Sequence, residues 1–235
     1  MHPLTESTFA GCQQLAGYQA TESAWRYAAA NQAAGVKIVV ATPTTGHVVM
    51  DYAASLARLA SFFVESGMPW TFLTEEGAGV GRNREALVTR FLETEASHLL
   101  FIDEDMAFTP GAFKFLWGWG DNPVILANYR RRFPPAEFTA RLPSGETLPT
   151  QAGDSGRIHV GYGGLGFALL PRTVLEQTKP PRFLGGYVNG AYESEDVPFF
   201  RQLTALGIPA YVDQRASQEV GHVGSFVYRH HTIFT

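Results

Sequence analysis

The chain has 235 residues, of which 45% are hydrophobic, and a formal net charge of -4 from 18 Lys and Arg against 22 Asp and Glu. This length and apolar content suffice for one domain with a full core, and the acidic balance gives no general attraction to nucleic acid or to an anionic membrane. The single cysteine, Cys12, excludes an intrachain disulfide framework and a thiolate-rich zinc site.

The sequence carries no signal for membrane insertion or export. No segment approaches the roughly 18 consecutive apolar residues that cross a bilayer, and the first residues lack a basic cluster followed by an apolar core. Together with the lone cysteine, this pattern predicts a cytoplasmic protein without a membrane span.

Apolar segments of two periodicities alternate along the chain. Short apolar runs predict strands over residues 36–41, 70–74, 98–102, 124–127, 158–160, 166–170 and 210–212. Helical spacing predicts helices over residues 56–64, 84–95, 171–177 and 194–206, and a further helix that begins at Pro110 behind a threonine cap. This alternation predicts an α/β fold, with a mostly parallel sheet between two layers of helices.

The two ends of this pattern set the predicted domain organisation. Residues 18–34 are rich in Ala, Gln and Glu and predict a helix that Gly35 ends. We therefore expect an N-terminal helical extension, residues 1–35, and a single domain over residues 36–235. Residues 129–156 and 180–191 have no clear period and predict loops, with a short hairpin in the first of them.

Three consecutive acidic residues, Asp103, Glu104 and Asp105, follow the apolar run of residues 98–102. Unpaired carboxylates packed together cost several kcal/mol, and ligands of open α/β sheets bind at the carboxyl ends of the strands. Carboxylate oxygens suit Mg²⁺ or Mn²⁺, which also binds nucleotide phosphates. The triplet therefore predicts a cation site, with an exposed loop that caps the next helix as the alternative.

Two later features favour the cation site, namely a second acidic cluster at Glu193, Glu195 and Asp196, and a histidine, His222, near Gly221 and Gly224. Short motifs then follow one another within residues 37–228: Ala41-Thr42-Pro43-Thr44, Gly81-Arg82-Asn83-Arg84, Phe101-Ile102-Asp103-Glu104-Asp105-Met106, Gly163-Gly164-Leu165-Gly166-Phe167, Glu195-Asp196-Val197-Pro198-Phe199-Phe200 and Gly221-His222-Val223-Gly224. In this order they resemble the GT-A glycosyltransferases, especially small enzymes similar to family 2. The resemblance implies a GT-A sheet, a nucleotide-diphosphate sugar donor such as a UDP-sugar, and Mn²⁺ or Mg²⁺.

The resemblance also implies roles for the acidic and histidine residues. The triplet would be the Asp-x-Asp motif, in which Asp105 ligates the metal and Asp103 contacts the metal or the ribose, with Glu104 beside the nucleotide. His222 would be a further metal ligand. Asp196, with Glu195 next to it, would take the proton from the attacking hydroxyl.

Other residues would contact the donor by the same resemblance. Thr42, Pro43 and Thr44 would receive the base, and Arg82 with Asn83 would lie along the nucleotide and its diphosphate. The glycines from 161 to 166, Gly164 among them, either let the backbone approach the sugar or form a bulged strand.

Two other functions fit the same sequence. One is a nucleotidyltransferase on a related sheet, although the Gly-rich, Lys-bearing signature of such enzymes is missing after the first strand. The other is a non-catalytic sugar-binding protein. For a transferase, the acceptor hydroxyl could belong to a glycan, a protein, a lipid-linked sugar or a modified DNA base. Nucleic acid is the least favoured because of the acidic balance.

Overall fold

The computed structural model describes residues 37–77, 79–121, 123–132, 135–188, 190–224 and 227–231. The expected N-terminal extension, with its helix over residues 18–34, lies outside the described residues. Within them, every helix is too short or too polar to cross a membrane.

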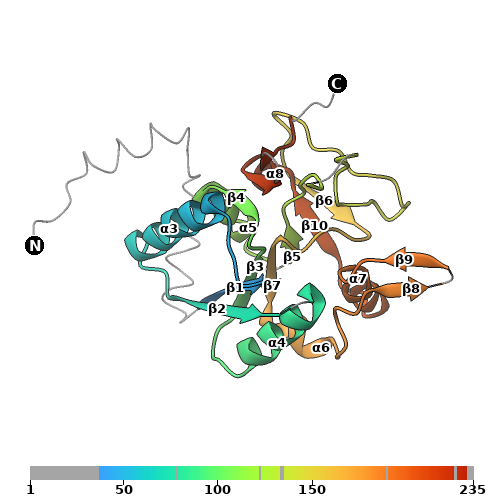
Figure 1. Cartoon of the computed structure of the whole chain (residues 1–235), viewed down its shortest axis with the longest axis horizontal. Coiled ribbons are helices and arrows are strands. Elements are labelled where there is room, and N and C mark those ends of the chain that lie inside the picture. The colour runs from blue at the N-terminus through green and yellow to red at the C-terminus, as the bar shows by residue number, and fades with distance from the viewer. Residues whose placement is uncertain are drawn as a thin grey trace, which may run out of the picture.

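A seven-stranded sheet forms the centre of the molecule (Figure 1). Its strands, in spatial order, are β2 (Trp70–Glu76), β1 (Ile38–Thr44), β3 (His98–Ile102), β7 (Phe167–Pro171), β5 (Val124–Leu126), β10 (Ala210–Asp213) and β6 (Arg157–Val160). Neighbouring pairs β1/β2, β1/β3 and β5/β10 are parallel, whereas β7 is antiparallel to β3 and β5, and β6 to β10. This arrangement confirms the mostly parallel sheet that the sequence predicts.

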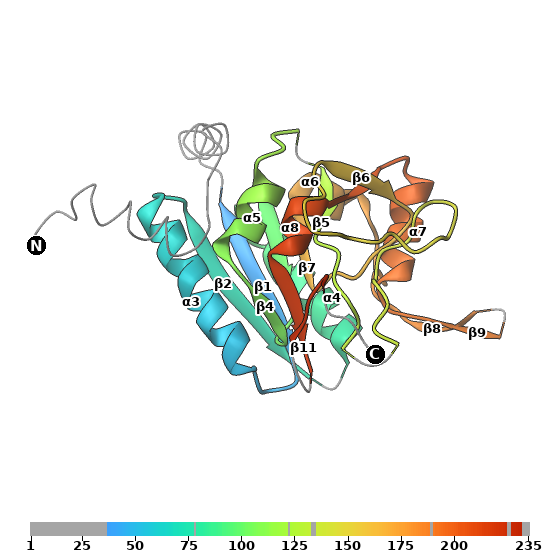
Figure 2. The same ribbon diagram turned by 90° about the horizontal axis from the view of Figure 1, so that it is seen from above.

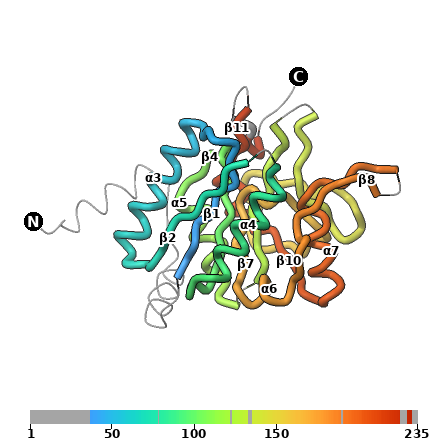
Figure 3. Tube along the Cα trace, turned by 60° about the horizontal axis from the view of Figure 1, so that its bottom comes forward, coloured from blue at the N-terminus to red at the C-terminus, as the bar shows by residue number. Residues whose placement is uncertain are grey.

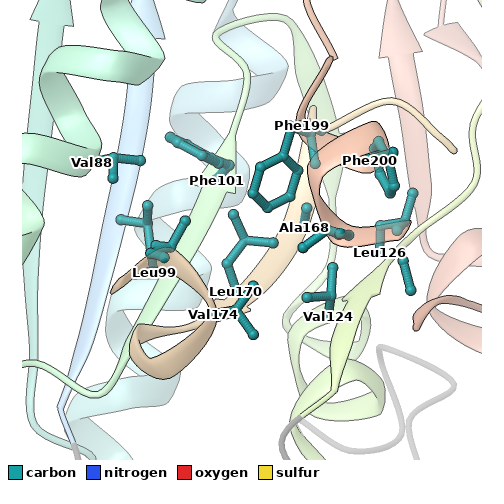
Figure 4. Close-up of a cluster of buried hydrophobic side chains, with 14 of the residues drawn as sticks. Val88, Leu99, Phe101, Val124, Leu126, Ala168, Leu170, Val174, Phe199 and Phe200 are labelled. Atoms are coloured by element: carbon teal, nitrogen blue, oxygen red, sulfur yellow. The ribbon is translucent and has the colours of Figure 1, made fainter. Parts of the chain in front are cut away.

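Helices cover both faces of this sheet (Figure 1). One layer holds α3 (Met50–Glu65), α5 (Pro110–Trp117) and α8 (Gln214–Gln218), and the other holds α4 (Val80–Leu92), α6 (Arg172–Gln177) and α7 (Val197–Ala205). Successive strand residues point to opposite faces, so Val39 and Ala41 join one buried cluster while Ile38 and Val40 join the other. Figure 4 shows the first cluster, where side chains of α4, α6 and α7 meet those of β3, β5 and β7.

Two smaller β-structures flank the sheet, and neither is predicted from the sequence. A three-stranded sheet joins β12 (Val227–Tyr228), β11 (Val220–Val223) and β4 (Met106–Phe108) in that order, and β8 (Gly186–Val188) pairs with β9 (Ala191–Glu193) as a separate hairpin. In Figure 2, β11 and β4 lie side by side in front of the main sheet, as their antiparallel pairing requires. This pairing brings the late residues 220–223 next to the segment that follows the acidic triplet.

Several element boundaries differ from the predicted ones, and three of them bear on the site. Strand β1 continues through Pro43 to Thr44 instead of ending at residue 41. The missing N–H of Pro43 is tolerated because the pairing of β1 with β3 already ends at Ala41. Helix α4 begins at Val80 rather than at residue 84, and α7 begins at Val197 rather than at residue 194. Arg84 is therefore inside a helix, whereas Asp196 precedes one.

Candidate active site

The acidic triplet forms a turn between β3 and β4 that the backbone holds at each residue. The N–H of Asp103 donates to the carbonyl of Gly166 at 3.0 Å. The carbonyl of Glu104 accepts from the N–H of Val49 at 3.2 Å, and that of Asp105 accepts from the N–H of Val223 at 2.8 Å. The turn is thus fixed by β7, by the start of α3 and by β11, and its three side chains point to different partners.

Glu104 holds the end of β1. One of its carboxylate oxygens accepts from the Thr44 hydroxyl at 2.5 Å and from the Thr45 N–H at 2.9 Å, and the other accepts from the Thr45 hydroxyl at 2.8 Å. Its expected contact with the nucleotide would therefore be indirect, through the loop that it orders.

Asp103 belongs to a cluster of carboxylates around one buried guanidinium, that of Arg84. The Nη2 atom of Arg84 donates to both oxygens of Asp103 at 2.8 and 2.9 Å. Its Nη1 atom donates to Glu195 at 3.1 Å and to Asp196 at 2.5 Å. Because the Arg84 side chain is only 1% exposed, it connects the end of β3 to the residues before α7 without access to bulk water. Three carboxylates share one cation, so the cluster has an excess of negative charge.

Two of these acids have pKa values above their ordinary ones. Burial raises the pKa of Asp196 to about 7, with further contributions from the charges of Glu195 and Asp103 that offset the attraction of Arg84. Burial likewise raises the pKa of Asp103 above its ordinary value. Asp196 thus titrates near neutral pH, and a general acid or base is most effective when its pKa is close to the working pH.

Asp105 faces His222 across the pairing of β4 with β11. The Nε2 atom of His222 lies 3.2 Å from Oδ2 of Asp105, and its Nδ1 atom lies 3.2 Å from the carbonyl oxygen of Arg130. A carbonyl oxygen only accepts hydrogen bonds, so Nδ1 donates to Arg130 and the ring presents Nε2 to the carboxylate of Asp105. Such a carboxylate and imidazole pair, oriented through the second ring nitrogen, fits a divalent cation.

Within the described residues, no group of three or more His, Cys, Asp and Glu side chains has a metal-binding arrangement. Asp105 and His222 would therefore supply two ligands. Mg²⁺ and ions like it commonly take one or two protein ligands and complete their shell with water and substrate phosphates. The residues present therefore fit an ion that binds together with a phosphorylated ligand.

Arg132 lies beside the same carboxylate, with its Nη1 atom in an ion pair with Oδ2 of Asp105. Burial acts to raise the pKa of Asp105, but the hydrogen bond and charge of His222 and the charge of Arg132 outweigh it, and the net pKa is below its ordinary value. Asp105 is thus a carboxylate across the physiological pH range, as a metal ligand must be.

The glycine cluster packs against the hydroxyl group of Tyr129, a buried side chain. The N–H of Gly166 donates to this hydroxyl at 2.9 Å, and the Tyr129 ring contacts that of His222 edge to face at 5.3 Å. A Cβ atom on Gly164 would lie 2.3 Å from the Tyr129 oxygen, which is far inside van der Waals contact. These glycines therefore allow Tyr129 to pack close to Asp103 and His222.

Gly166→Ala is expected to lower the free energy of unfolding by about 1–3 kcal/mol, the usual cost of overpacking a core. The added Cβ would lie 2.6 Å from the Tyr129 hydroxyl and 2.8 Å from Oδ2 of Asp103. Urea denaturation measures the change. The control is Gly186→Ala, where no atom lies within 4 Å of the new Cβ; an equal loss in both variants would contradict the packing argument.

The residues expected to contact the donor occupy two environments. Thr42 is buried in β1 and shares a hydrogen bond of 2.5 Å with the hydroxyl of Tyr52, and Pro43 and Thr44 complete that strand. Asn83 is also buried, and its amide donates to the carbonyl of Thr44 at 3.0 Å. Arg82 is exposed on the first turn of α4. The structure thus places the Arg82-Asn83 segment beside the end of β1, with Asn83 as the link.

Sequence reasoning did not assign a role to Arg84 or Tyr129. For Arg84 a signal exists, because it shares one helical face with the buried residues Leu87, Val88 and Phe91. A guanidinium within an apolar stripe requires buried acidic partners. The acidic triplet and the cluster at residues 193–196 are the candidate partners in the sequence. Tyr129 stands beside a run of three arginines, a context that does not predict a buried side chain.

Comparisons with known proteins identify the fold. No protein-family model and no curated protein sequence matches the chain. Among solved structures, A197 from STIV matches with a TM-score of 0.56 and 21% identity over 80% of this chain and 86% of that chain. GalNAc-T7, crystallised with UDP, GalNAc and Mn²⁺, matches with a TM-score of 0.52 and 10% identity over 80% of this chain and 44% of its own. The described chain therefore has a GT-A-like fold.

Proposed function

We propose that this chain is a divalent-metal-dependent glycosyltransferase that moves a sugar from a nucleotide-diphosphate donor, with UDP as the expected nucleotide, to a hydroxyl acceptor. The observation that carries the proposal is the pair of Asp105 Oδ2 and His222 Nε2, 3.2 Å apart beside the carboxyl end of β3. On a GT-A-like fold, this is the edge where ligands of α/β sheets bind.

Asp105 and His222 are the residues that would hold Mn²⁺ or Mg²⁺. When bound, such an ion neutralises the charge that develops on a departing diphosphate. Arg132, whose guanidinium is next to Asp105, is positioned to contact the same phosphates. Glu104 would order the end of β1, where the base is expected, through its hydrogen bonds to Thr44 and Thr45.

Asp196 is the proposed general base. The acceptor oxygen forms a bond to the anomeric carbon as the bond from this carbon to the diphosphate oxygen breaks, and the electron pair leaves with the nucleoside diphosphate. A carboxylate oxygen of Asp196 takes the proton of the acceptor hydroxyl. Arg84 would act as a positioning residue, because it binds Asp196 and Asp103 at the same time.

The pH dependence of the reaction follows from the pKa of Asp196. A general base works when deprotonated, so kcat/KM is expected to rise about tenfold per pH unit below pH 7 and to level off above it, because burial raises the pKa of Asp196 to about 7. Initial rates of nucleoside diphosphate release at subsaturating donor measure this profile. A rate that falls as the pH rises from 5 to 7 would contradict the assignment.

The direct test is a thermal-shift screen of nucleotide sugars with and without Mn²⁺, because a ligand that binds only the native protein raises its melting temperature. We expect a UDP-sugar to raise Tm only when Mn²⁺ is present. No shift with any nucleotide sugar would contradict the proposal.

The released product separates the three candidate functions. A glycosyltransferase releases nucleoside diphosphate from the donor, slowly to water and faster to an acceptor. A nucleotidyltransferase instead releases pyrophosphate from a nucleoside triphosphate and a sugar phosphate. A sugar-binding protein shows the thermal shift but leaves every donor intact in the presence of an acceptor library.

A further inference from the structure

The hairpin of β8 and β9 carries two exposed tyrosines on one face. It projects from the body of the molecule in Figures 1, 2 and 3. Tyr187 pairs directly with Tyr192 across the two strands, so both rings lie on the same side of the ribbon, 5.6 Å apart and edge to face. Their exposed fractions are 80% and 66%. The two rings form a contiguous exposed apolar patch, the kind of surface feature at which ligands bind.

The chemistry of the hairpin is aromatic and neutral. Between Arg182 and Glu193 the sequence contains no charged residue, only Phe, Leu, Gly, Tyr, Val, Asn and Ala. A tyrosine combines an apolar ring with a hydroxyl that donates and accepts hydrogen bonds. A sugar ring has matching properties, with a C–H face that stacks on the aromatic ring and hydroxyl groups around its edge.

The hairpin is joined closely to the acidic cluster. Glu193, at the end of β9, forms an ion pair of 2.5 Å with Arg201 of α7. At the other strand's base, a Cβ on Gly185 would lie 2.9 Å from the backbone nitrogen of Glu195. Asp196 is four positions after Tyr192, a distance of at most about 14 Å along an extended chain. An oligosaccharide with its reacting hydroxyl at Asp196 can therefore reach the tyrosines.

Two other occupants fit these observations less well. A stable protein interface buries about 800 Å² on each partner, whereas two tyrosines bury roughly 150–250 Å² each, and the hairpin adds only small side chains beyond Val188 and Leu184. An anionic membrane attracts basic residues, but the hairpin has none and the chain has a net charge of -4.

We propose that the β8–β9 hairpin is an acceptor subsite for a neutral oligosaccharide, in which Tyr187 and Tyr192 stack on sugar rings beyond the one that reacts at Asp196. This inference rests on the proposed glycosyltransferase function and specifies the class of its acceptor. The tyrosines would set acceptor affinity, while donor binding would depend on residues at the end of β3 and on β11.

Saturation-transfer NMR of the protein with UDP and Mg²⁺ tests this subsite. The probes are neutral linear oligosaccharides of glucose, mannose, galactose or xylose. We expect at least one of them to bind. The Tyr187→Ala, Tyr192→Ala double variant should raise the Kd of this oligosaccharide by about tenfold or more. The double Tyr→Phe variant keeps the rings and should retain most of the affinity. Leu206→Ala removes another exposed apolar side chain and should change nothing.

The outcomes separate this inference from the proposed function. Calorimetric titration with UDP and Mg²⁺ should give the same Kd for the double alanine variant as for the unmodified protein. A protein that binds UDP but none of the oligosaccharides, or that binds them equally without the tyrosines, overturns the subsite and leaves the transferase proposal in place. Tyrosine-dependent binding to phosphatidylcholine vesicles, or tyrosine-dependent dimerisation, in place of oligosaccharide binding also overturns it. Tyrosine-dependent sugar binding without any binding of UDP or UDP-sugars overturns the transferase proposal instead.

Discussion

Replacing Arg84 with methionine is expected to lower the free energy of unfolding at pH 7 by about 3–5 kcal/mol, the cost of removing one partner from a buried ion pair. Methionine retains the apolar length of the side chain but not its charge. The carboxylates of Asp103, Glu195 and Asp196, between 13% and 25% exposed, would then lie together without a counter-ion. Urea denaturation monitored by tryptophan fluorescence measures the loss.

The pH dependence of this loss distinguishes a charge effect from a packing effect. Without Arg84, the folded-state pKa values of Asp103 and Asp196 rise further above their unfolded values, so the folded variant binds more protons than the unfolded chain near neutral pH. Its stability should therefore increase as the pH falls from 7 toward 4. The control is Arg90→Met, which breaks an exposed pair with Glu75 (44% and 35% exposed) and should cost at most about 1 kcal/mol. A loss at Arg84 that does not change with pH would refute the charge explanation.

Asp105→Asn is expected to reduce metal-dependent transfer by about a thousandfold, because a bound cation stabilises the leaving diphosphate by several kcal/mol. An amide has nearly the same shape as the carboxylate but no negative charge to hold the ion. Titration with Mn²⁺ in the presence of UDP should show the corresponding loss of metal affinity, independently of turnover.

Asp121→Asn is the matched control for this change. Asp121 is an exposed acid that also pairs with an arginine, Arg157, at 2.7 Å, so its variant undergoes the same chemical change away from the acidic triplet. Its Mn²⁺ affinity and rate should equal those of the unmodified chain. If Asp105→Asn retained Mn²⁺-dependent binding of UDP, Asp105 would not be a metal ligand and the proposed site would be wrong.

Local signals in the sequence were sufficient for the main sheet. The strand over residues 98–102 is confirmed at both ends, since its apolar run is bounded by polar residues. The helix start at Pro110 is also confirmed, with the Thr109 hydroxyl accepting from the N–H of Gly111 at 3.0 Å. These features depend on neighbours in the chain, so a single sequence reveals them.

Features that depend on distant partners were not predicted. Strand β4 has three residues and is defined by its pairing with β11, more than a hundred positions later in the chain. The β8–β9 hairpin has glycine at positions 185, 186 and 190, a composition typical of loops. Predicting the role of Arg84 would require knowing that residues 103 and 196 lie close together, and this proximity is a property of the tertiary fold.

The pairing of β11 with β4 has a consequence for how the protein matures during synthesis. His222 reaches Asp105 only through this late strand, and the N–H of Val223 is bonded to the carbonyl of Asp105 at 2.8 Å. A nascent chain that has left the ribosome only as far as α8 would contain the acidic turn and the residues of the Arg84 cluster. It would not yet contain His222. Binding of a cation that needs both Asp105 and His222 would then begin only after every strand of the main sheet has been synthesised.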